Sequence, residues 1–163
     1  MKQIVTVAGI IYNEKGEILC TEREVGKYEY TSLKWEFPGG KLEIGENNIQ
    51  ALERELREEL DIKVQIQDKF YQVEHDYPDF HLSMAVYNCK LLSKELKMNV
   101  HKALKWVNPK DLLKLEWAGA DLPVAQKIVD KFNKKAEKAE AKRLEKEAKA
   151  RKIAQKIAAK SKK

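Results

Sequence analysis

The stretch RELREEL, residues 54–60, places Glu55, Glu58 and Glu59 three and four positions apart. On a helix these residues are neighbours, and like charges at such spacings destabilise the helix by about 0.2–0.5 kcal/mol per pair. RELREEL by itself is typical of an ordinary solvated helix face. The surrounding residues decide between that interpretation and a site that uses the charge.

The helix that carries RELREEL is predicted to be amphipathic. Asn47 or Asn48 is suited to cap its N-terminus, and the pattern predicts that it runs to about Leu60. At about 100° per residue, one face collects the large aliphatic residues Ile49, Leu52, Leu56 and Leu60. The three glutamates form a second stripe beside this face, so we expect a dense negative patch next to the core.

The 163-residue chain has the composition of a soluble globular protein, with 43% hydrophobic and 36% charged residues. No apolar run approaches the roughly 18 residues of a membrane span, and we expect no membrane contact. The apolar N-terminal stretch leads into a turn at residues 13–16, which favours a buried strand over a signal peptide. Cys20 and Cys89 lie in apolar, strand-like segments, so we expect buried free thiols in a cytoplasmic protein.

The net charge of +6 is unevenly distributed. From Phe132 onward there are 13 Lys or Arg and 4 Glu, a net charge of +9, while the residues before it have a net charge of −3. We therefore predict two parts, a mildly acidic body over residues 1–131 and a basic tail over residues 132–163.

The tail is rich in Ala, Lys and Glu and has no Gly or Pro to end a helix. Its only large aliphatics are Leu144, Ile153 and Ile157, which are too few for a sustained coiled-coil seam. We predict that it is helical or partly disordered, solvated, and frayed towards Lys163.

Strands and short helices are predicted for the rest of the body. The strands are expected at residues 3–12 and 17–23 as a hairpin, at 63–76 and 81–92 around the turn YPDF, and at 103–107. In FPGGK, Pro38, Gly39 and Gly40 are expected to prevent regular structure. NPKDLLKL predicts a short helix capped by Asn108, and a last helix begins near Asp121.

The residues before the acidic helix complete a longer signature. Eight of the nine fixed positions of a 23-residue motif are matched, by Gly40, Glu46, Arg54, Glu55, Leu56, Glu58, Glu59 and Ile62. The motif resembles the Nudix box, whose last part reads Arg-Glu-aliphatic-any-Glu-Glu-any-Gly-aliphatic. Asp61 stands where that family has glycine, and Asp tolerates a left-handed backbone better than most residues.

The resemblance covers about residues 3–131, because WEFPGGK, TVAGIIYNEKGEIL, YPDFHLS and ADLPV also resemble the MutT branch of Nudix proteins. It implies an α/β fold, an α/β/α sandwich around a mixed β-sheet, to which the basic helical tail is added. It also implies a hydrolase that cleaves a nucleoside diphosphate linked to another group.

Metal binding gives a physical reason for the acidic stripe. A nucleoside triphosphate is strongly negative, so carboxylates would repel it unless divalent cations bridge the two, and Mg²⁺ prefers carboxylate and water ligands. The resemblance implies that Glu55, Glu58 and Glu59 bind Mg²⁺ or Mn²⁺, with the Gly39 carbonyl as a further ligand.

The remaining box residues have roles that the resemblance implies. Arg54 pairs with and orients the glutamates, Glu46 supports them, and Glu58 or Glu59 could help to activate water. The MutT branch resembles enzymes that attack the β-phosphorus and release nucleoside monophosphate and pyrophosphate.

One departure concerns the loop before ALKW, where relatives often carry another acidic residue. Val100 stands at that position in this chain. Either the box glutamates suffice, or His101 or Glu95 substitutes. The three histidines are otherwise scattered, and we expect each to be structural or solvated.

The predicted substrate-binding residues are Arg23, Phe37, Gly40, Tyr77 and Asp121. Arg23 resembles a nucleotide contact but could be an ordinary exposed arginine, and Phe37 and Tyr77 could flank the base or belong to the core. Asp121 resembles the base-recognising position, which is Asn in 8-oxo-dGTP hydrolases and Asp in (d)CTP-type enzymes. It could also cap the helix that follows it.

The base preference follows from the chemistry of Asp121. An ionised carboxylate only accepts hydrogen bonds, which suits the amino group of cytosine and also the N1 and N2 hydrogens of a guanine. The predicted substrates are therefore (deoxy)nucleoside triphosphates, of the 8-oxo-dGTP or CTP type.

Two alternatives remain open from the sequence. The first is a Nudix hydrolase of another nucleoside diphosphate compound, such as ADP-ribose or a dinucleoside polyphosphate. The second is a non-catalytic Nudix-like module that binds RNA through its basic tail. The complete set of box glutamates favours an enzyme, and the tail lacks interleaved aromatic residues, so any nucleic-acid contact is expected to be weak and non-specific.

Overall fold

A mixed, seven-stranded sheet forms the centre of the molecule in the computed structural model, which describes residues 1–162. The strands are β1 (Lys2–Tyr12), β2 (Ile18–Glu22), β3 (Trp35–Glu36), β4 (Gly39–Lys41), β5 (Val64–Asp76), β6 (Phe80–Leu91) and β7 (Ala103–Val107). Their order is β3-β2-β1-β6-β5, with β4 paired to β1 and β7 paired to β2. β1 and β6 are parallel over their whole length, and the other named pairs are antiparallel.

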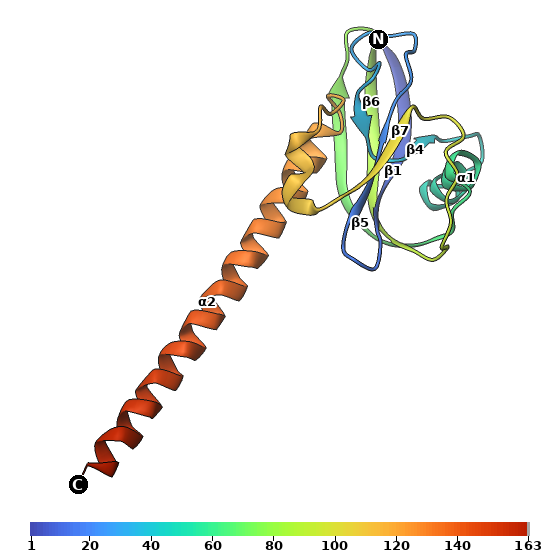
Figure 1. Ribbon diagram of the computed structural model, residues 1–163. Coiled ribbons are helices and arrows are strands. Elements are labelled where there is room, and N and C mark those ends of the chain that lie inside the picture. Colours follow the sequence, from blue (N-terminus) through green and yellow to red (C-terminus); the bar gives the residue numbers. More distant parts are fainter. Residues whose placement is uncertain (163) are drawn as a thin grey trace.

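Helices cover both faces of this sheet (Figure 1). α1 (Asn48–Leu60) lies on one face, and η1 (Pro109–Lys114) and the first turns of α2 (Leu122–Ser161) lie on the other. β1 alternates between the two cores, since Val7 and Ile11 pack with α1 while Ala8 and Ile10 pack with the α2 side. The predicted α/β fold with a mixed sheet between helical layers is confirmed.

The expectation that FPGGK lacks regular structure is wrong, because residues 39–41 form β4. Gly39 and Gly40 pair with Ala8 and Val7 of β1 in an antiparallel register. A Cβ atom on Gly39 would lie 2.0 Å from the carbonyl oxygen of Val7. The glycine therefore allows the backbone of β4 to approach β1 instead of interrupting the strand.

α1 begins and ends as its sequence predicts. Asn47 forms a capping box with Gln50, in which each side chain accepts a hydrogen bond from the other residue's backbone N–H, at 2.8 Å and 3.0 Å. Asp61 ends the helix in the left-handed conformation, with φ of 52°. Ile49 is an exception to the predicted buried face, because it lies in the first turn and is 37% exposed, while Ala51 is fully buried.

The segment NPKDLLKL forms a 3₁₀ helix rather than an α-helix. Its cap is Asn108, as predicted, whose side chain accepts a hydrogen bond from the N–H of Lys110. The indole of Trp117 donates to the carbonyl oxygen of Leu112 at 2.8 Å. This bond uses one of the carbonyls that a longer helix would need, so the short 3₁₀ form is stable here.

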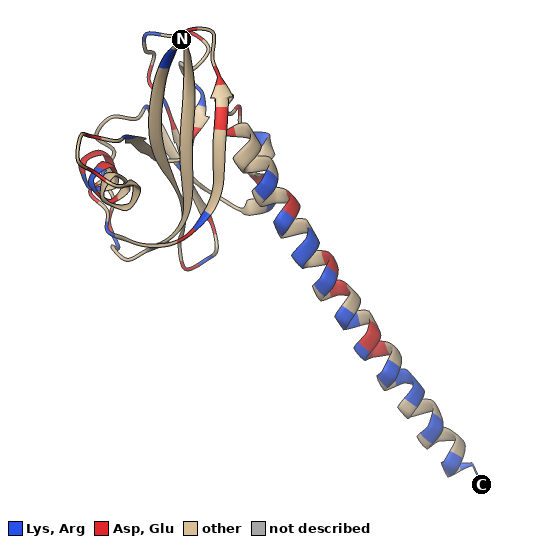
Figure 2. Ribbon diagram, turned by 180° about the vertical axis from the view of Figure 1, so that it is seen from behind, with Lys and Arg blue, Asp and Glu red and all other residues tan. Residues whose placement is uncertain are grey.

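α2 is a single helix of 40 residues, of which only the first turns are packed against the body. Its buried side chains are Val124, Ala125, Ile128 and Val129. Beyond these first turns the helix projects from the body into solvent as far as Ser161 (Figures 1 and 2). The fraying predicted at Lys163 lies outside the described residues.

Both cysteines are buried free thiols, as predicted. Burial raises the pKa of Cys20 and of Cys89 to about 12. Within residues 1–162, no helix combines the length and the apolar character that crossing a membrane requires.

Candidate active site

A cavity of about 410 Å³ lies beside β1, β4 and α1. This volume is typical of sites for small molecules. Its lining includes all five predicted substrate-binding residues, Arg23, Phe37, Gly40, Tyr77 and Asp121. Gly39, Glu55 and Glu59 line the same cavity, so residues that are far apart in the sequence meet in one site.

The double glycine brings β4 close to the acidic helix. A Cβ atom on Gly40 would lie 2.3 Å from the carboxyl carbon of Glu55, which no side chain could accommodate without moving that carboxylate. Backbone and carboxylate oxygens therefore line the same wall of the cavity. Both are hard oxygen donors of the kind that Mg²⁺ prefers.

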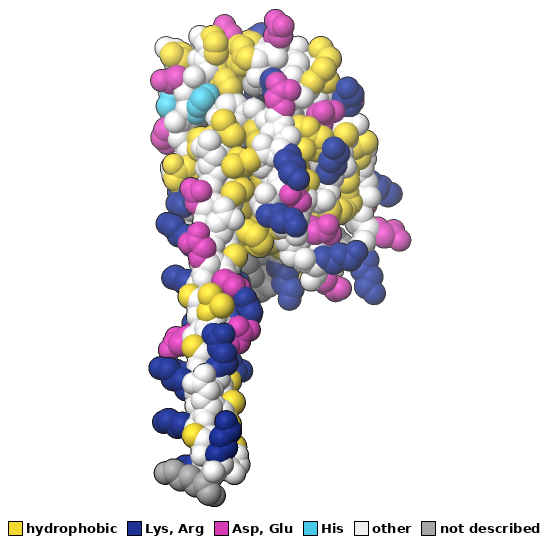
Figure 3. Space-filling model, turned by 60° about the vertical axis from the view of Figure 1, so that its left-hand side comes forward, with side chains coloured by type: hydrophobic (Ala, Val, Ile, Leu, Met, Phe, Trp, Pro, Cys, Tyr) yellow, Lys and Arg dark blue, Asp and Glu magenta, His cyan; other side chains and the backbone are white. Residues whose placement is uncertain are grey.

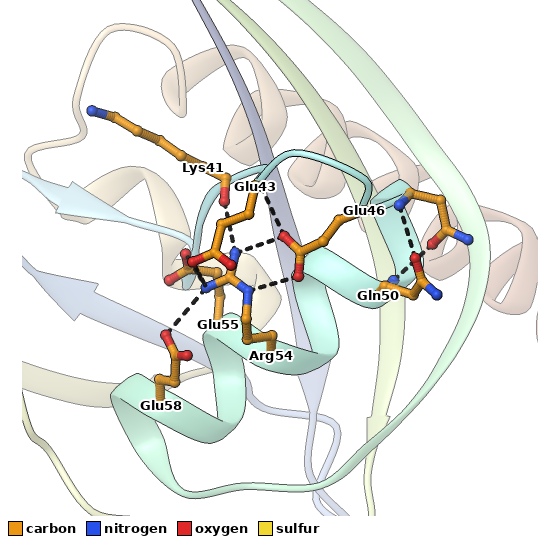
Figure 4. A network of polar contacts seen from close by, with 8 residues as sticks. Lys41, Glu43, Glu46, Gln50, Arg54, Glu55 and Glu58 are labelled. Carbon is orange, nitrogen blue, oxygen red and sulfur yellow. Dashed lines mark hydrogen bonds and ion pairs between the residues drawn. The ribbon is translucent and has the colours of Figure 1, made fainter.

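Arg54 is the centre of a network that holds the acidic residues around it (Figure 4). Its guanidinium donates two hydrogen bonds to Glu46, at 2.7 Å and 2.9 Å, and a third at 2.9 Å to the carbonyl of Lys41. It also donates to Glu55 at 3.0 Å and to Glu58 at 3.1 Å. The bidentate bond to Arg54 lowers the pKa of Glu46, so Glu46 remains an ionised anchor for the arginine.

The three predicted metal ligands occupy different environments. Glu55 and Glu59 line the cavity, and their side chains are 14% and 21% exposed. Glu58 is not among the lining residues, is 56% exposed, and points to Arg54 (Figure 4). Within the part of the chain that the structure describes, no three acidic, histidine or cysteine side chains already converge in an arrangement that would hold a cation.

Glu59 lies in an environment that is unfavourable for an ionised carboxylate. Burial, together with the nearby charges of Glu55 and Glu36, raises the pKa of Glu59 to about 8. Its Oε2 atom is buried and has no hydrogen-bond partner among the described residues. A buried carboxylate oxygen without a partner is unfavourable in the free protein, and a cation or a proton would satisfy it.

Asp121 also lines the cavity and is 5% exposed. Its Oδ1 accepts a hydrogen bond of 2.9 Å from the backbone N–H of Phe37. Asp121 is the N-cap residue of α2, as predicted, but its side chain makes no capping bond to the helix. Phe37 itself stacks on Trp117, with ring centroids 4.6 Å apart, and Tyr77 is fixed by the hydrogen bond that its hydroxyl accepts from the N–H of Ala120.

The environment of Asp121 disfavours the ionised carboxylate that the sequence analysis assumed. Burial and the charge of Glu36 raise the pKa of Asp121 well above its ordinary value, while the bond from Phe37 and the charge of Arg23 act in the opposite direction. A neutral carboxyl group can donate as well as accept a hydrogen bond. Asp121 therefore does not by its charge alone restrict the base to an amino donor.

Two residues at the site were not among the predicted site residues. Glu36 lines the cavity and accepts a hydrogen bond of 3.2 Å from Arg23. The Nε2 atom of His101, which is buried, lies 3.6 Å from Glu36 and 3.6 Å from Glu59. The signal for Glu36 was its position in WEFPGGK beside the double glycine, and the signal for His101 was its place next to Val100.

The site lies within a recognised domain. The NUDIX domain model matches residues 2–128, which is most of the chain. The chain belongs to the Nudix family. The Nudix box predicted from residues 40–62 therefore forms β4, α1 and the turns that flank them.

Relatives of this Nudix domain include enzymes with assigned activities. The chain is 42% identical over 84 residues to an 8-oxo-dGTP diphosphatase of Escherichia coli, which covers 52% of this chain and 64%, less than two thirds, of that protein. It is 33% identical over 126 residues to the CTP pyrophosphohydrolase of Escherichia coli, which covers 77% of this chain and 91% of that protein. These relatives confirm the predicted enzyme class, a hydrolase acting on acid anhydrides.

A solved structure has the same Nudix fold. The crystal structure of the MutT protein from Methanosarcina mazei Go1 aligns with a TM-score of 0.70 and 27% sequence identity, over 82% of this chain and 96% of that one. The uncovered part of this chain corresponds in size to the exposed part of α2. The MutT-type resemblance is thereby confirmed for the fold.

The cavity residues fit a divalent cation. Glu55 and Glu59 are adjacent carboxylates, and the free buried oxygen of Glu59 is the kind of donor that a cation would bind. Glu36 and Asp121 add further acidic groups, against the two basic residues Arg23 and Lys41. An anionic ligand would be repelled by this wall unless cations accompany it.

Proposed function

We propose that this Nudix domain hydrolyses (deoxy)nucleoside triphosphates to nucleoside monophosphate and pyrophosphate, with Mg²⁺ or Mn²⁺ as cofactor. The observation that carries the proposal is the cavity itself, in which Asp121, Phe37 and Tyr77 lie with the carboxylates of Glu55 and Glu59. The first group offers aromatic rings and a polar side chain for a base, and the second offers oxygen ligands for cations. A nucleotide that contacts both groups is the ligand that fits.

Each residue has a proposed part in the reaction. Glu55 and Glu59 hold the cation, with Glu58 and the Gly39 carbonyl as further ligands, while Arg54 and Glu46 fix the direction of Glu55. When bound, the cation neutralises phosphate charge and lowers the pKa of the attacking water. Glu58 or Glu59 accepts the proton of that water, whose oxygen attacks the β-phosphorus as the bond from this phosphorus to the α–β bridging oxygen breaks.

The substrate base is proposed from the names of the relatives and from Asp121. An 8-oxo-dGTP diphosphatase and a CTP pyrophosphohydrolase are both similar to this chain. Phe37 and Tyr77 bound the base, Asp121 bonds its edge, and Arg23 contacts the phosphates at the mouth of the cavity. Gly40 allows the Glu55 carboxylate to lie directly against β4, where we expect it to face the phosphate chain.

The proposal is tested by product-resolved turnover with Mg²⁺ across the common and oxidised nucleoside triphosphates, with ADP-ribose as a further substrate. We expect monophosphate and pyrophosphate from one base class, and a loss of about 100-fold or more in Glu59→Gln. Glu53→Gln is the matched control, because Glu53 is an exposed glutamate on the same helix. Cleavage of ADP-ribose alone would contradict the triphosphate assignment, and no cleavage of any nucleotide would contradict the enzyme.

A further inference from the structure

The lysines of α2 are gathered on one side of the helix. At about 100° per residue, eleven of them fall within an arc of about 120°. These residues, here called the lysine stripe, are Lys127, Lys131, Lys134, Lys135, Lys138, Lys142, Lys146, Lys149, Lys152, Lys156 and Lys160. Figure 2 shows basic residues along the ribbon of the projecting helix, and Figure 3 shows their side chains on one face of it.

The acidic residues of the tail lie mainly outside this arc. Glu137, Glu140 and Glu147 are on the remaining surface, and Glu145 alone falls within the stripe. Arg143, which is also outside the stripe, is paired with Glu140 and with Glu147. Among the described residues, Lys149 is the one stripe lysine within 4.0 Å of a carboxylate, at 3.2 Å from Glu145.

The lysine stripe is straight and long. Its ends, Lys127 and Lys160, are separated by 33 residues, which is about 50 Å of helix, so one positive charge occurs about every 4.5 Å. The charge density matches a polyanion with regularly spaced charges. A flexible single strand can follow a straight line of this length, whereas the backbone of a duplex winds away from it.

A second cavity lies at the base of the stripe, where α2 leaves the body. It has a volume of about 480 Å³ and shares no lining residue with the active-site cavity. Three lysines line it, Lys15, Lys131 and Lys135, together with the partly buried aromatic ring of Phe70. Lys131 already lies over that ring, at 5.6 Å from its centroid.

The polar side chains of this second cavity are amides. Gln67, Asn88 and Asn108 line it, and no carboxylate is among the described residues that form its walls. An aromatic face beside lysines suits an unpaired base and its phosphate, and amides suit a ribose hydroxyl. The cavity and the stripe therefore form one continuous surface for a strand of nucleotides.

We propose that the lysine stripe and the cavity at its base bind single-stranded RNA. The stripe neutralises the phosphates, and the cavity receives one unpaired nucleotide. An anionic membrane fits less well, because an interfacial helix needs a face of bulky apolar residues and the tail has only four, Phe132, Leu144, Ile153 and Ile157. This binding is separate from nucleotide hydrolysis, since the two cavities have no residue in common.

The test compares two triple variants of the full-length protein with equal charge. Lys138→Gln, Lys142→Gln and Lys156→Gln remove three charges from the stripe. Arg143→Gln, Arg151→Gln and Lys162→Gln remove three charges from other sides of the same helix. Affinity for a labelled, unstructured RNA is measured by fluorescence anisotropy between about 50 and 200 mM salt, and circular dichroism checks the helix content.

We expect the stripe variant to bind RNA at least about tenfold more weakly at about 0.1 M salt, and its salt slope to fall by about 2. The control variant should change both values much less. Equal losses in the two variants would contradict the stripe, because net charge alone would then explain the binding. Binding to anionic lipid vesicles without binding to RNA would identify a membrane surface and overturn the proposal.

The cavity is tested separately by the preference for RNA over DNA of the same sequence. Gln67→Ala should reduce this preference, whereas Gln65→Ala, an exposed residue of the same strand outside the cavity, should not. Wild-type protein that binds both strands equally would contradict the assignment to RNA. Nucleotide hydrolysis should be unchanged in all of these variants, so a failure here is distinguishable from a failure of the proposed enzyme.

Discussion

Glu59 is the residue at which the proposed function conflicts most with stability. With a pKa of about 8 against an ordinary value of 4.5, the folded protein binds this proton more tightly than the unfolded chain does. As the pH rises from about 4.5 to 8 the unfolded chain loses the proton first, so stability falls through that range and the loss is complete above it. The active-site charge therefore destabilises the metal-free protein at high pH.

Glu59→Gln should raise the free energy of unfolding of the metal-free protein by about 2 kcal/mol at pH ~9, because a neutral amide replaces the buried carboxylate. At pH ~5 the two proteins should be nearly equal. Denaturant unfolding in the presence of a chelator measures this, with Glu53→Gln as the control. A variant less stable than the wild type at the higher pH would show that the charge is not strained.

Asp121→Asn tests the base end of the cavity. The amide oxygen can still accept the hydrogen bond from Phe37, so the fold should be retained, but the group becomes a fixed donor. We expect kcat/KM for the preferred nucleotide to fall about 10- to 100-fold and the order of preference among bases to change. An equal reduction for every nucleotide would mean that Asp121 supports the cavity wall and does not read the base.

The chemical types of the site residues could be predicted from the sequence, but their protonation could not. Asp121 was identified from ADLPV, yet the raised pKa depends on burial and on Glu36, which is 85 positions away in sequence. The contact between His101 and Glu59 likewise depends on how the loop before β7 packs onto α1. Such distances are set by tertiary packing, which local sequence patterns do not predict.

Among the elements, α1 is well capped at its N-terminus, but the residue that ends it is held in an unfavourable backbone conformation. Asp61 adopts φ of 52°, a left-handed conformation in which glycine is favoured over every other residue. Asp61→Gly should therefore stabilise the protein by about 0.5–1 kcal/mol, and Asp61→Ala should destabilise it by a similar amount. Thermal denaturation of the pair measures this, and a destabilised Asp61→Gly would contradict the cap geometry.

β4 should tolerate no side chain beside the acidic helix. In Gly40→Ala the new Cβ would displace Glu55. We therefore expect turnover to fall by about tenfold or more, and the Mg²⁺ concentration needed for half-maximal turnover to rise. Gly26→Ala is the control, because nothing lies within 4 Å of its added Cβ. Normal Mg²⁺ dependence in Gly40→Ala would mean that Glu55 is not a metal ligand.

Periodicity and caps were sufficient to predict the long elements. The capping box and the aliphatic face fixed α1, and alternation fixed β1, β5 and β6. β4 was missed because glycines are read as turn residues, although here they permit a close strand pairing. The short helix at residues 109–114 and its Asn108 cap were predicted, but the sequence pattern did not distinguish a 3₁₀ helix from an α-helix.

At the scale of the whole molecule, α2 consists of a first segment packed against the body and a longer segment exposed to solvent. After Val129 its side chains are almost all exposed, which supports the proposed boundary near Phe132 without a change in secondary structure. Removing the residues after Asn133 should leave kcat/KM within about twofold and shift the melting temperature by no more than about 2 °C. A large loss of turnover would mean that the tail belongs to the catalytic unit.

The order of strands could not be deduced from the residues, because strand patterns do not specify their neighbours. The family resemblance implied a mixed sheet, but it did not include the parallel pairing of β1 with β6, from Lys2 beside Phe80 to Tyr12 beside Lys90. Composition did predict how charge is divided along the chain, because the excess of basic residues lies on the exposed part of α2. The arrangement of its lysines on one side needed the helix to be continuous as far as Ser161.

The central claim, that Glu55 and Glu59 serve the hydrolysis of a nucleoside triphosphate, is tested most directly by turnover in isotopically labelled water with Mg²⁺. Mass spectrometry of the products would locate the oxygen that attacked. The account predicts label in pyrophosphate and none in the nucleoside monophosphate, with turnover about 100-fold or more slower in Glu59→Gln. Label in the monophosphate, release of inorganic phosphate alone, or undiminished turnover by Glu59→Gln would contradict it.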